Sequence, residues 1–182
     1  MIRADIIKAA QAALAGGVVC YPTEGVFGLG CLPHEFEAVQ RILDFKGRNA
    51  ANGVILIGAN LPQLLPWIAP SAEELQHLMS DTDTPTTWIM TASPIAPDWI
   101  TGGRNTVAVR LCSHPVAAAL CNACDSALVS TSANRSGHRP ADNTIAARLW
   151  TKPVADAVVS GTPFAGQGPS KIIDARNGTV IR

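Results

Sequence analysis

The sequence predicts an α/β fold, in which a twisted mixed or mainly parallel sheet carries helices on its faces. Short apolar runs without polar alternation, such as residues 54–57 between two glycines, are typical of strands in the middle of a sheet. These runs alternate with segments of helical periodicity, such as residues 34–45. Apolar residues make up 47% of the 182-residue chain and charged residues only 15%, which favours thick internal layers and a single domain over residues 1–182.

Each expected element has its own pattern. Helices are predicted where apolar residues recur every three or four positions: residues 6–14 capped by Asp5, 34–45, 71–79 with a Ser71/Glu74 capping box, 115–122, and a segment capped by Asp142 or Asn143 that ends at 149. Strands are predicted for short apolar or β-branched runs at residues 18–21, 54–57, 86–91, 106–111, 127–130, 171–174 and 179–181. Residues 23–30 are rich in glycine and are interpreted as a turn region.

Charge and composition limit the function. The formal net charge is zero and no basic stripe is visible, which speaks against RNA as the direct substrate but leaves room for a small anionic ligand. The N-terminal segment lacks the features of a signal peptide, and no apolar run approaches the roughly 20 residues of a membrane span. The five cysteines lie mostly in apolar runs, as expected for reduced, buried thiols. We therefore expect a cytoplasmic protein that is not bound to a membrane.

The common phosphate and metal motifs are missing from the sequence. It contains neither the G-x-x-x-x-G-K-[ST] phosphate loop nor a G-x-G-x-x-G segment that opens a helix. Cys121 and Cys124 form a lone C-x-x-C pair, whereas a structural zinc site usually needs two such pairs. The four histidines are scattered along the chain. We predict no protein metal site, and we interpret the two cysteines as thiols near a helix end.

Polar residues gather instead in five segments that lie at or near the ends of predicted strands and helices, where α/β sheets bind ligands. The segments are residues 21–30, 46–48, 106–110, 130–137 and 168–174, the last followed by Arg182. Each has an ordinary structural interpretation when it is taken alone: a turn, a helix-dipole partner, an ion pair, a polar loop or an edge strand. Alternation places Thr106 and Arg110 on one face of their strand, where the arginine needs an anion, either a protein carboxylate or the carboxylate of a bound amino acid.

Taken together, these segments resemble the YrdC/TsaC family of threonylcarbamoyl-AMP synthases. The matching strings are YPTEGVFGLG, the KGR after the helix of residues 34–45, TVAVR followed by His114 and Pro115, STSAN with RSG, and PSKIID. The resemblance covers nearly the whole chain and corresponds to the short, single-domain form. It implies a twisted α/β sheet around a large concave cavity. It also implies an enzyme, a nucleotidyltransferase that converts L-threonine, bicarbonate and ATP into threonylcarbamoyl-AMP and pyrophosphate for tRNA modification.

The resemblance also implies residue roles, and it assigns no catalytic acid or base. Threonine would contact four residues: Thr23, Arg110, Ser130 and Ser170. ATP would contact seven residues: Lys46, Arg48, Thr106, Ser132, Asn134, Pro140 and Arg182. A threonine carbamate is already an anionic nucleophile, so positioning and charge neutralisation suffice for its attack on the α-phosphorus. Mg²⁺ would be carried by the ATP phosphates. The product would pass to a separate tRNA-modifying transferase complex.

Some positions depart from the family pattern. Residues 49–53 replace a proline-containing loop, and Asn52 stands where a phosphate-binding lysine is possible. Residues 82–85 replace a Trp-Pro-Gly-Pro segment, and the acids Asp81 and Asp83 would weaken ATP binding if they bordered the cavity. Three other hypotheses therefore stay open: an RNA-binding module, a nucleotide-binding subunit without turnover, and a related carbamoyl-transfer or lyase activity on the same fold.

Overall fold

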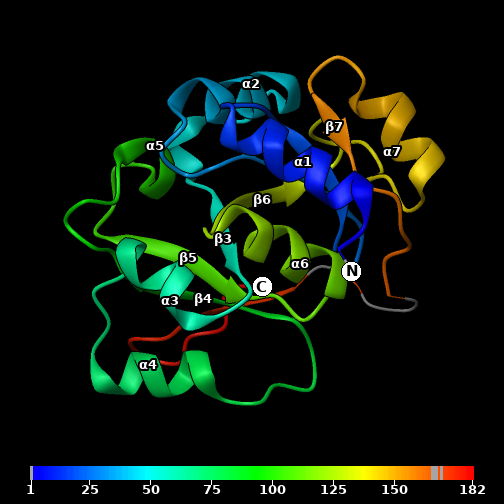
Figure 1. Cartoon of the computed structure of the whole chain (residues 1–182). Coiled ribbons are helices and arrows are strands. Elements are labelled where there is room, and N and C mark those ends of the chain that lie inside the picture. The colour runs from blue at the N-terminus through cyan, green and yellow to red at the C-terminus, as the bar shows by residue number, and fades with distance from the viewer. Residues whose placement is uncertain (1, 165–167, 169) are drawn as a thin grey trace.

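The computed structural model describes residues 2–164, 168 and 170–182, and it contains one eight-stranded sheet (Figure 1). The strand order is β7-β1-β2-β6-β3-β5-β4-β8. The strands are β1 (Val19–Pro22), β2 (Phe27–Gly30), β3 (Ile55–Gly58), β4 (Thr86–Thr91), β5 (Thr106–Leu111), β6 (Leu128–Ser132), β7 (Ala157–Val158) and β8 (Lys171–Asp174). The predicted α/β fold with a mixed sheet is therefore confirmed.

The sheet is mixed rather than mainly parallel. The pairs β1–β2, β2–β6, β3–β6 and β4–β5 are antiparallel, whereas β1–β7, β3–β5 and β4–β8 are parallel. The expected turn region of residues 23–30 was wrong in its second half, because Phe27–Gly30 is strand β2. Two glycines in four residues lower the strand propensity of this segment and hide it from sequence patterns. The short connection from β1 to β2 requires an antiparallel hairpin.

Seven α-helices flank the described sheet. They are α1 (Ala4–Leu14), α2 (Phe36–Lys46), α3 (Leu61–Leu64), α4 (Ala72–Met79), α5 (Asp98–Thr101), α6 (Pro115–Cys124) and α7 (Thr144–Thr151). The Ser71/Glu74 capping box of α4 is confirmed, and Asn143 rather than Asp142 caps α7. Arg3 occupies the cap position of α1, while Asp5 lies in the first turn and accepts a bond from the Ser160 amide. In the described part of the chain no helix is both long and apolar enough to span a membrane.

One late prediction fails. Residues 179–181 do not form a strand, because Val180 makes only an isolated bridge to Ile173 of β8. The described C-terminal segment thus folds back along β8 without extending the sheet. This return places Arg182 beside the residue that precedes β8, since its guanidinium donates to the Ser170 carbonyl at 3.3 Å.

Both faces of the sheet are covered by apolar packing. Helices α1 and α6 lie side by side over one face (Figure 1), where Ile6, Ala9 and Leu120 pack with Val19 and Tyr21 of β1. Helix α2 covers the other face, where Val39 and Ile42 pack with Cys20, Phe27 and Leu29. The alternation of Val19, Cys20 and Tyr21 between the two clusters follows from the two-residue period of a strand. A sheet buried on both faces explains the apolar strands of the sequence.

Helices α1 and α6 leave part of their face open. In the antiparallel pair β3–β6, Ile57 lies opposite Leu128 and Ile55 lies opposite Ser130. Ile57 and Leu128 are buried in the cluster under the helices. Ile55 packs at the margin of this cluster and, with Ser130, lines a cavity. A step of two residues along each strand therefore leads from the part of this face that is packed against helices α1 and α6 to the part that borders the cavity. The polar residues of β6 lie in this second part.

Gly30 permits a close approach between β2 and its neighbours. A Cβ atom at this position would lie 2.1 Å from the Val129 carbonyl oxygen and 2.8 Å from the Tyr21 hydroxyl. Gly28, on the same strand, faces the cavity, where a Cβ atom would meet Thr23 at 3.1 Å and Ser130 at 3.3 Å. The two glycines of the GLG motif therefore have different roles: Gly30 permits close packing of the strands, and Gly28 leaves space in the cavity.

We expect Gly30→Ala to lower the free energy of unfolding by about 3 kcal/mol, because the new methyl group would overlap backbone that cannot move aside. Urea unfolding monitored by circular dichroism measures this loss. Gly168→Ala is the matched control, since no atom of the described residues lies within 4 Å of a Cβ atom there. Equal stability of the two variants would contradict this account of strand β2.

Buried thiols make the fold sensitive to alkali. Burial raises the pKa of Cys20 and that of Cys31 from 9.0 to about 12. Between pH 9 and 12 the unfolded chain therefore loses protons that the folded chain keeps, so the free energy of unfolding falls as the pH rises. Each thiol contributes on the order of 1.4 kcal/mol per pH unit in that window. In urea unfolding between pH 8 and 11, the free energy of unfolding should fall less steeply with pH for Cys20→Ala than for the wild type. An equal slope for the two proteins would contradict this prediction.

Candidate functional site

The main candidate site is a cavity of about 550 Å³ on the open part of the sheet. It is lined by nine of the eleven residues that the sequence singled out: Thr23, Arg48, Arg110, Ser130, Ser132, Asn134, Pro140, Ser170 and Arg182. They come from the β1–β2 hairpin, strands β5 and β6, the loops around α2 and α7, and both ends of the β8 segment. The structure thus brings together residues that are up to 159 positions apart in the sequence, from Thr23 to Arg182.

Part of the cavity wall combines hydroxyl groups with a buried ion pair. The Thr23 hydroxyl donates to the Val26 carbonyl at 2.7 Å, which fixes the turn that follows β1. The Ser170 hydroxyl lies 2.9 Å from that of Thr87. Arg110 projects from β5 as its alternation predicts, and its guanidinium lies 3.2 Å from the Glu24 carboxylate, with only 11% of the arginine side chain exposed. The protein carboxylate that Arg110 was expected to need is therefore Glu24.

Glu24 is the site residue to which sequence reasoning gave no role. Its Oε1 accepts hydrogen bonds from the backbone amides of Ser113, at 2.8 Å, and His114, at 3.3 Å. Burial acts to raise the pKa of Glu24, but the charge of Arg110 and these amides together hold it below its usual value. The carboxylate is thus ionised at neutral pH. A glutamate inside a glycine-rich turn carries no sequence signal of this contact, because its partners lie about 90 residues away.

Two further arginines make another part of the cavity wall positive, on the side where it adjoins a neighbouring hollow. Arg48 donates to the Gly53 carbonyl at 2.9 Å, and Arg182 donates to the Ser170 carbonyl. Burial, followed by repulsion from Arg182, lowers the pKa of Arg48 below its ordinary value. Neither arginine has a carboxylate partner among the described residues. Two neighbouring guanidinium groups without a counter-ion form a ready site for a polyphosphate.

Lys46 lies behind the cavity wall rather than in it. Its ammonium donates to the backbone carbonyls of Ser132, at 2.5 Å, and Asn134, at 2.9 Å, and to the Asn134 side-chain oxygen at 3.1 Å. Burial, with a smaller contribution from Arg48, lowers the pKa of Lys46 to about 8. These contacts connect the end of α2 to the STSAN segment and hold that loop in shape. The contact between Lys46 and a phosphate stays a prediction.

Four other residues named in the sequence analysis do not line the main cavity. Thr106 and Asn52 line an adjoining hollow of about 230 Å³ that shares Arg48 and Arg182 with it. Asp81 and Asp83 line a third hollow, of about 300 Å³, which shares Glu24 and Pro85 with the main cavity. The two acids thus lie next to the main cavity but do not line it. Pro169 of the PSKIID motif lies outside the described residues.

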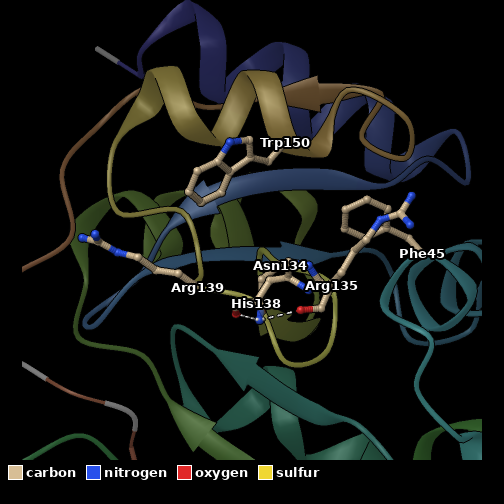
Figure 2. Close-up of a pocket in the computed structure, with 6 residues that line it drawn as sticks. All are labelled: Phe45, Asn134, Arg135, His138, Arg139 and Trp150. Atoms are coloured by element: carbon tan, nitrogen blue, oxygen red, sulfur yellow. Dashed lines mark hydrogen bonds between the residues drawn. The ribbon is translucent and has the colours of Figure 1, made fainter.

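A further hollow of about 420 Å³ lies outside the loop of residues 134–139 (Figure 2). The rings of Phe45 and Trp150 and the side chains of Arg135, His138 and Arg139 surround it, and Asn134 is its boundary with the main cavity. The Arg135 guanidinium lies 5.6 Å from the centre of the Phe45 ring. Because this hollow has only Asn134 in common with the residues singled out from the sequence, we place the functional site in the larger cavity.

Few side chains that commonly bind metal ions lie along the described cavity wall. Among residues 2–164, 168 and 170–182, no group of three or more His, Cys, Asp or Glu side chains is placed to hold a metal ion. Glu24 is the one acid along the described cavity wall, and Arg110 and two amides already occupy it. All five cysteines are free and buried, which places Cys121 and Cys124 in the core on α6.

Comparison with known proteins identifies the family. A family model described as Sua5/YciO/YrdC, telomere recombination, matches residues 11–182. The chain belongs to this family. It is 47% identical over 168 residues to a threonylcarbamoyl-AMP synthase of Halorhodospira halophila, covering 92% of this chain and 88% of that protein. A protein of the same name from Alkalilimnicola ehrlichii is 44% identical over 185 residues, covering 99% and 96% of the two chains.

Solved structures agree with this assignment. Sua5 of P. abyssi in complex with L-threonine superposes with a TM-score of 0.88 and 30% identity. The match covers 97% of this chain and 53% of the Sua5 chain, so this Sua5/YciO/YrdC member spans about half the length of that relative. YciO of E. coli has a TM-score of 0.83 at 24% identity over 97% of this chain and 87% of that one, and it supports the fold alone.

The position of Lys46 yields a test. We expect Lys46→Met to lower both the free energy of unfolding, by about 2 kcal/mol, and the affinity for ATP, because buried carbonyls of the STSAN loop lose their donor. Urea unfolding and calorimetric titration with ATP measure the two effects. Lys152→Met, at an exposed position after α7, is the matched control. Lost ATP binding with unchanged stability would instead mean that Lys46 leaves the loop and contacts the phosphates.

Proposed function

We propose that this chain synthesises threonylcarbamoyl-AMP from L-threonine, bicarbonate and ATP, with release of pyrophosphate. One observation carries the proposal: hydroxyl and cationic side chains from five distant segments line one cavity. The proposal is further supported by the names of relatives that are 40–47% identical over nearly the whole chain, and by the L-threonine complex of a protein with the same fold.

The polar side chains of the cavity wall suggest where the substrates bind. Arg110 would pair with the threonine carboxylate, with Thr23, Ser130 and Ser170 around the rest of the amino acid. Arg48 and Arg182 would bind the ATP phosphates, because no carboxylate of the described residues forms an ion pair with either of them. The remaining nucleotide contacts would come from Ser132, Asn134 and Pro140, with Thr106 in the adjoining hollow. Lys46 would act through the loop that it holds.

The chemistry needs little from the protein beyond placement. Threonine and bicarbonate condense to a carbamate with loss of water, and a carbamate oxygen then attacks the α-phosphorus while the bond to pyrophosphate breaks. Since the carbamate is already anionic, the residues that matter are those that hold it in line and stabilise negative charge. Mg²⁺ bound to ATP would supply further charge neutralisation, and the phosphates rather than protein carboxylates would hold it.

The proposal includes a place in the cell. The product is a reactive mixed anhydride, which requires a separate transferase to pass the threonylcarbamoyl group to tRNA. We propose a cytoplasmic enzyme that delivers this product to such a tRNA-modifying complex and binds RNA weakly or not at all. The zero net charge supports this division of labour, because direct RNA binding usually needs an extended basic surface.

The test is pyrophosphate release together with mass spectrometry of the nucleotide product. We expect release to require both L-threonine and bicarbonate. We expect Arg110→Ala to lower kcat/KM at least about 100-fold, because the carboxylate of the bound threonine would lose its cationic partner. Arg148→Ala, which removes an exposed arginine of α7, is the control and should keep full activity.

Other outcomes would favour the competing hypotheses. ATP binding without turnover would indicate a nucleotide-binding subunit. Pyrophosphate release that is indifferent to threonine would indicate a different reaction on the same fold. Salt-resistant binding of tRNA in the absence of any product would indicate an RNA-binding module.

A further inference from the structure

His114 lies where three parts of the chain meet beside the main cavity. It is the N-cap residue of α6, and only 3% of it is exposed. Its backbone amide donates to the Glu24 carboxylate at 3.3 Å, and its ring packs against that of Phe164 with 4.8 Å between the ring centres. The proposed reaction itself uses neither nitrogen of this imidazole, so the role of the side chain is open.

The hydrogen bonds of the imidazole assign its tautomer. The Val116 amide donates to Nδ1 at 3.3 Å, so Nδ1 carries a lone pair and caps the first turn of α6. Nε2 lies 3.1 Å from the Thr162 carbonyl oxygen, which can only accept, so Nε2 carries the hydrogen. The ring is therefore neutral, and each of its nitrogens has one defined partner.

The segment that His114 binds runs along β1 and the turn that follows it. The Val159 amide donates to the Cys20 carbonyl at 2.8 Å, and the Phe164 amide donates to the Glu24 carbonyl at 3.1 Å. The chain after β7 thus continues beside β1 and ends this contact on the cavity turn.

Glu24 is consequently held at two points, and His114 contributes to both. The main-chain carbonyl of Glu24 accepts from Phe164, and its carboxylate accepts from the His114 amide. The Nε2 of His114 in turn donates to Thr162, two residues before Phe164. We propose that His114 is a positioning residue whose Nε2 orients Glu24 through this segment. Because Glu24 lies 3.2 Å from the guanidinium of Arg110, the same bond orients Arg110 as well.

This inference rests on the proposed function, since it takes threonine as the ligand of Arg110 and Thr23. Both residues line the cavity together with Glu24. A small displacement of the turn therefore weakens threonine binding, because the contacts depend on exact placement. It leaves ATP binding, which the proposed function assigns to Arg48 and Arg182 among others, nearly unaltered. A residue that only stabilised the fold would not distinguish the two substrates.

Two substitutions separate the two nitrogens of the ring. His114→Asn keeps an acceptor for the Val116 amide but loses the donor to Thr162, whereas His114→Gln keeps a donor near the place of Nε2 and leaves the helix uncapped. Pyrophosphate release at saturating ATP and bicarbonate gives the KM for L-threonine, and calorimetry gives the Kd for ATP.

We expect His114→Asn to raise the KM for L-threonine about tenfold, the effect of one lost hydrogen bond, with the Kd for ATP unchanged within about twofold. His114→Gln should keep the threonine KM within about threefold of the wild type, although the lost cap lowers its melting temperature by about 3 °C. His34→Asn, at an exposed position before α2, is the matched control and should alter neither constant. An unaltered threonine KM in His114→Asn, equal increases in both His114 variants, or equal weakening of threonine and ATP would overturn the proposal.

A second measurement uses the wild-type protein and does not depend on any variant folding. Nitrogen-15 NMR distinguishes a ring nitrogen that carries hydrogen from one with a lone pair, and the contact with Phe164 identifies the ring of His114. At neutral pH we expect hydrogen on Nε2 alone; hydrogen on Nδ1 would overturn the proposal. Wild-type protein whose pyrophosphate release is indifferent to threonine would overturn the proposed function and this inference with it. Threonine-dependent release with an unaltered KM in His114→Asn overturns the inference alone.

Discussion

The ion pair between Arg110 and Glu24 connects the parts of the molecule on which the site depends. Arg110 belongs to β5, in the half of the sheet that contains β3 and β4, whereas Glu24 lies in the turn of the β1–β2 hairpin in the other half. The same carboxylate accepts amides from the segment between β5 and α6. A charge buried to this extent is stable only when its partners are in place, so the pair fixes the distance between the two halves.

Cationic side chains of the site have three different environments, although the sequence shows them only as Lys and Arg. Arg110 has a carboxylate partner, whereas Arg48 and Arg182 donate to backbone carbonyls. The ammonium group of Lys46 donates to the carbonyls of Ser132 and Asn134 in the neighbouring loop. The consequences differ accordingly. Arg48 and Arg182, which have no carboxylate partner among the described residues, suit a polyphosphate, whereas the bonds of Lys46 to the loop stabilise its shape.

The sequence was sufficient for most of the architecture, because buried strands and amphipathic helices leave periodic patterns. The strands at Thr86–Thr91, Thr106–Leu111 and Lys171–Asp174 have the predicted bounds. Strand β2 was not predicted because its two glycines have a low strand propensity. A strand at residues 179–181 was predicted from their β-branched side chains, but such residues also occur in a segment that folds back without joining the sheet. That residues 1–182 form a single domain, that Mg²⁺ travels with ATP, and which residue contacts which substrate all stay predictions. Glu24 escaped notice because its partners depend on tertiary structure alone.

Asn134 separates the main cavity from the hollow between Phe45 and Trp150, and it lines both. Its amide donates to the carbonyls of Arg135 and His138, while its oxygen accepts from Ser132 and Lys46. The partition between the two spaces is thus one side chain thick and rigidly bonded. A compound bound between the two aromatic rings would press on the loop of Ser132 and Asn134 from outside, and would thereby alter the main cavity without occupying it.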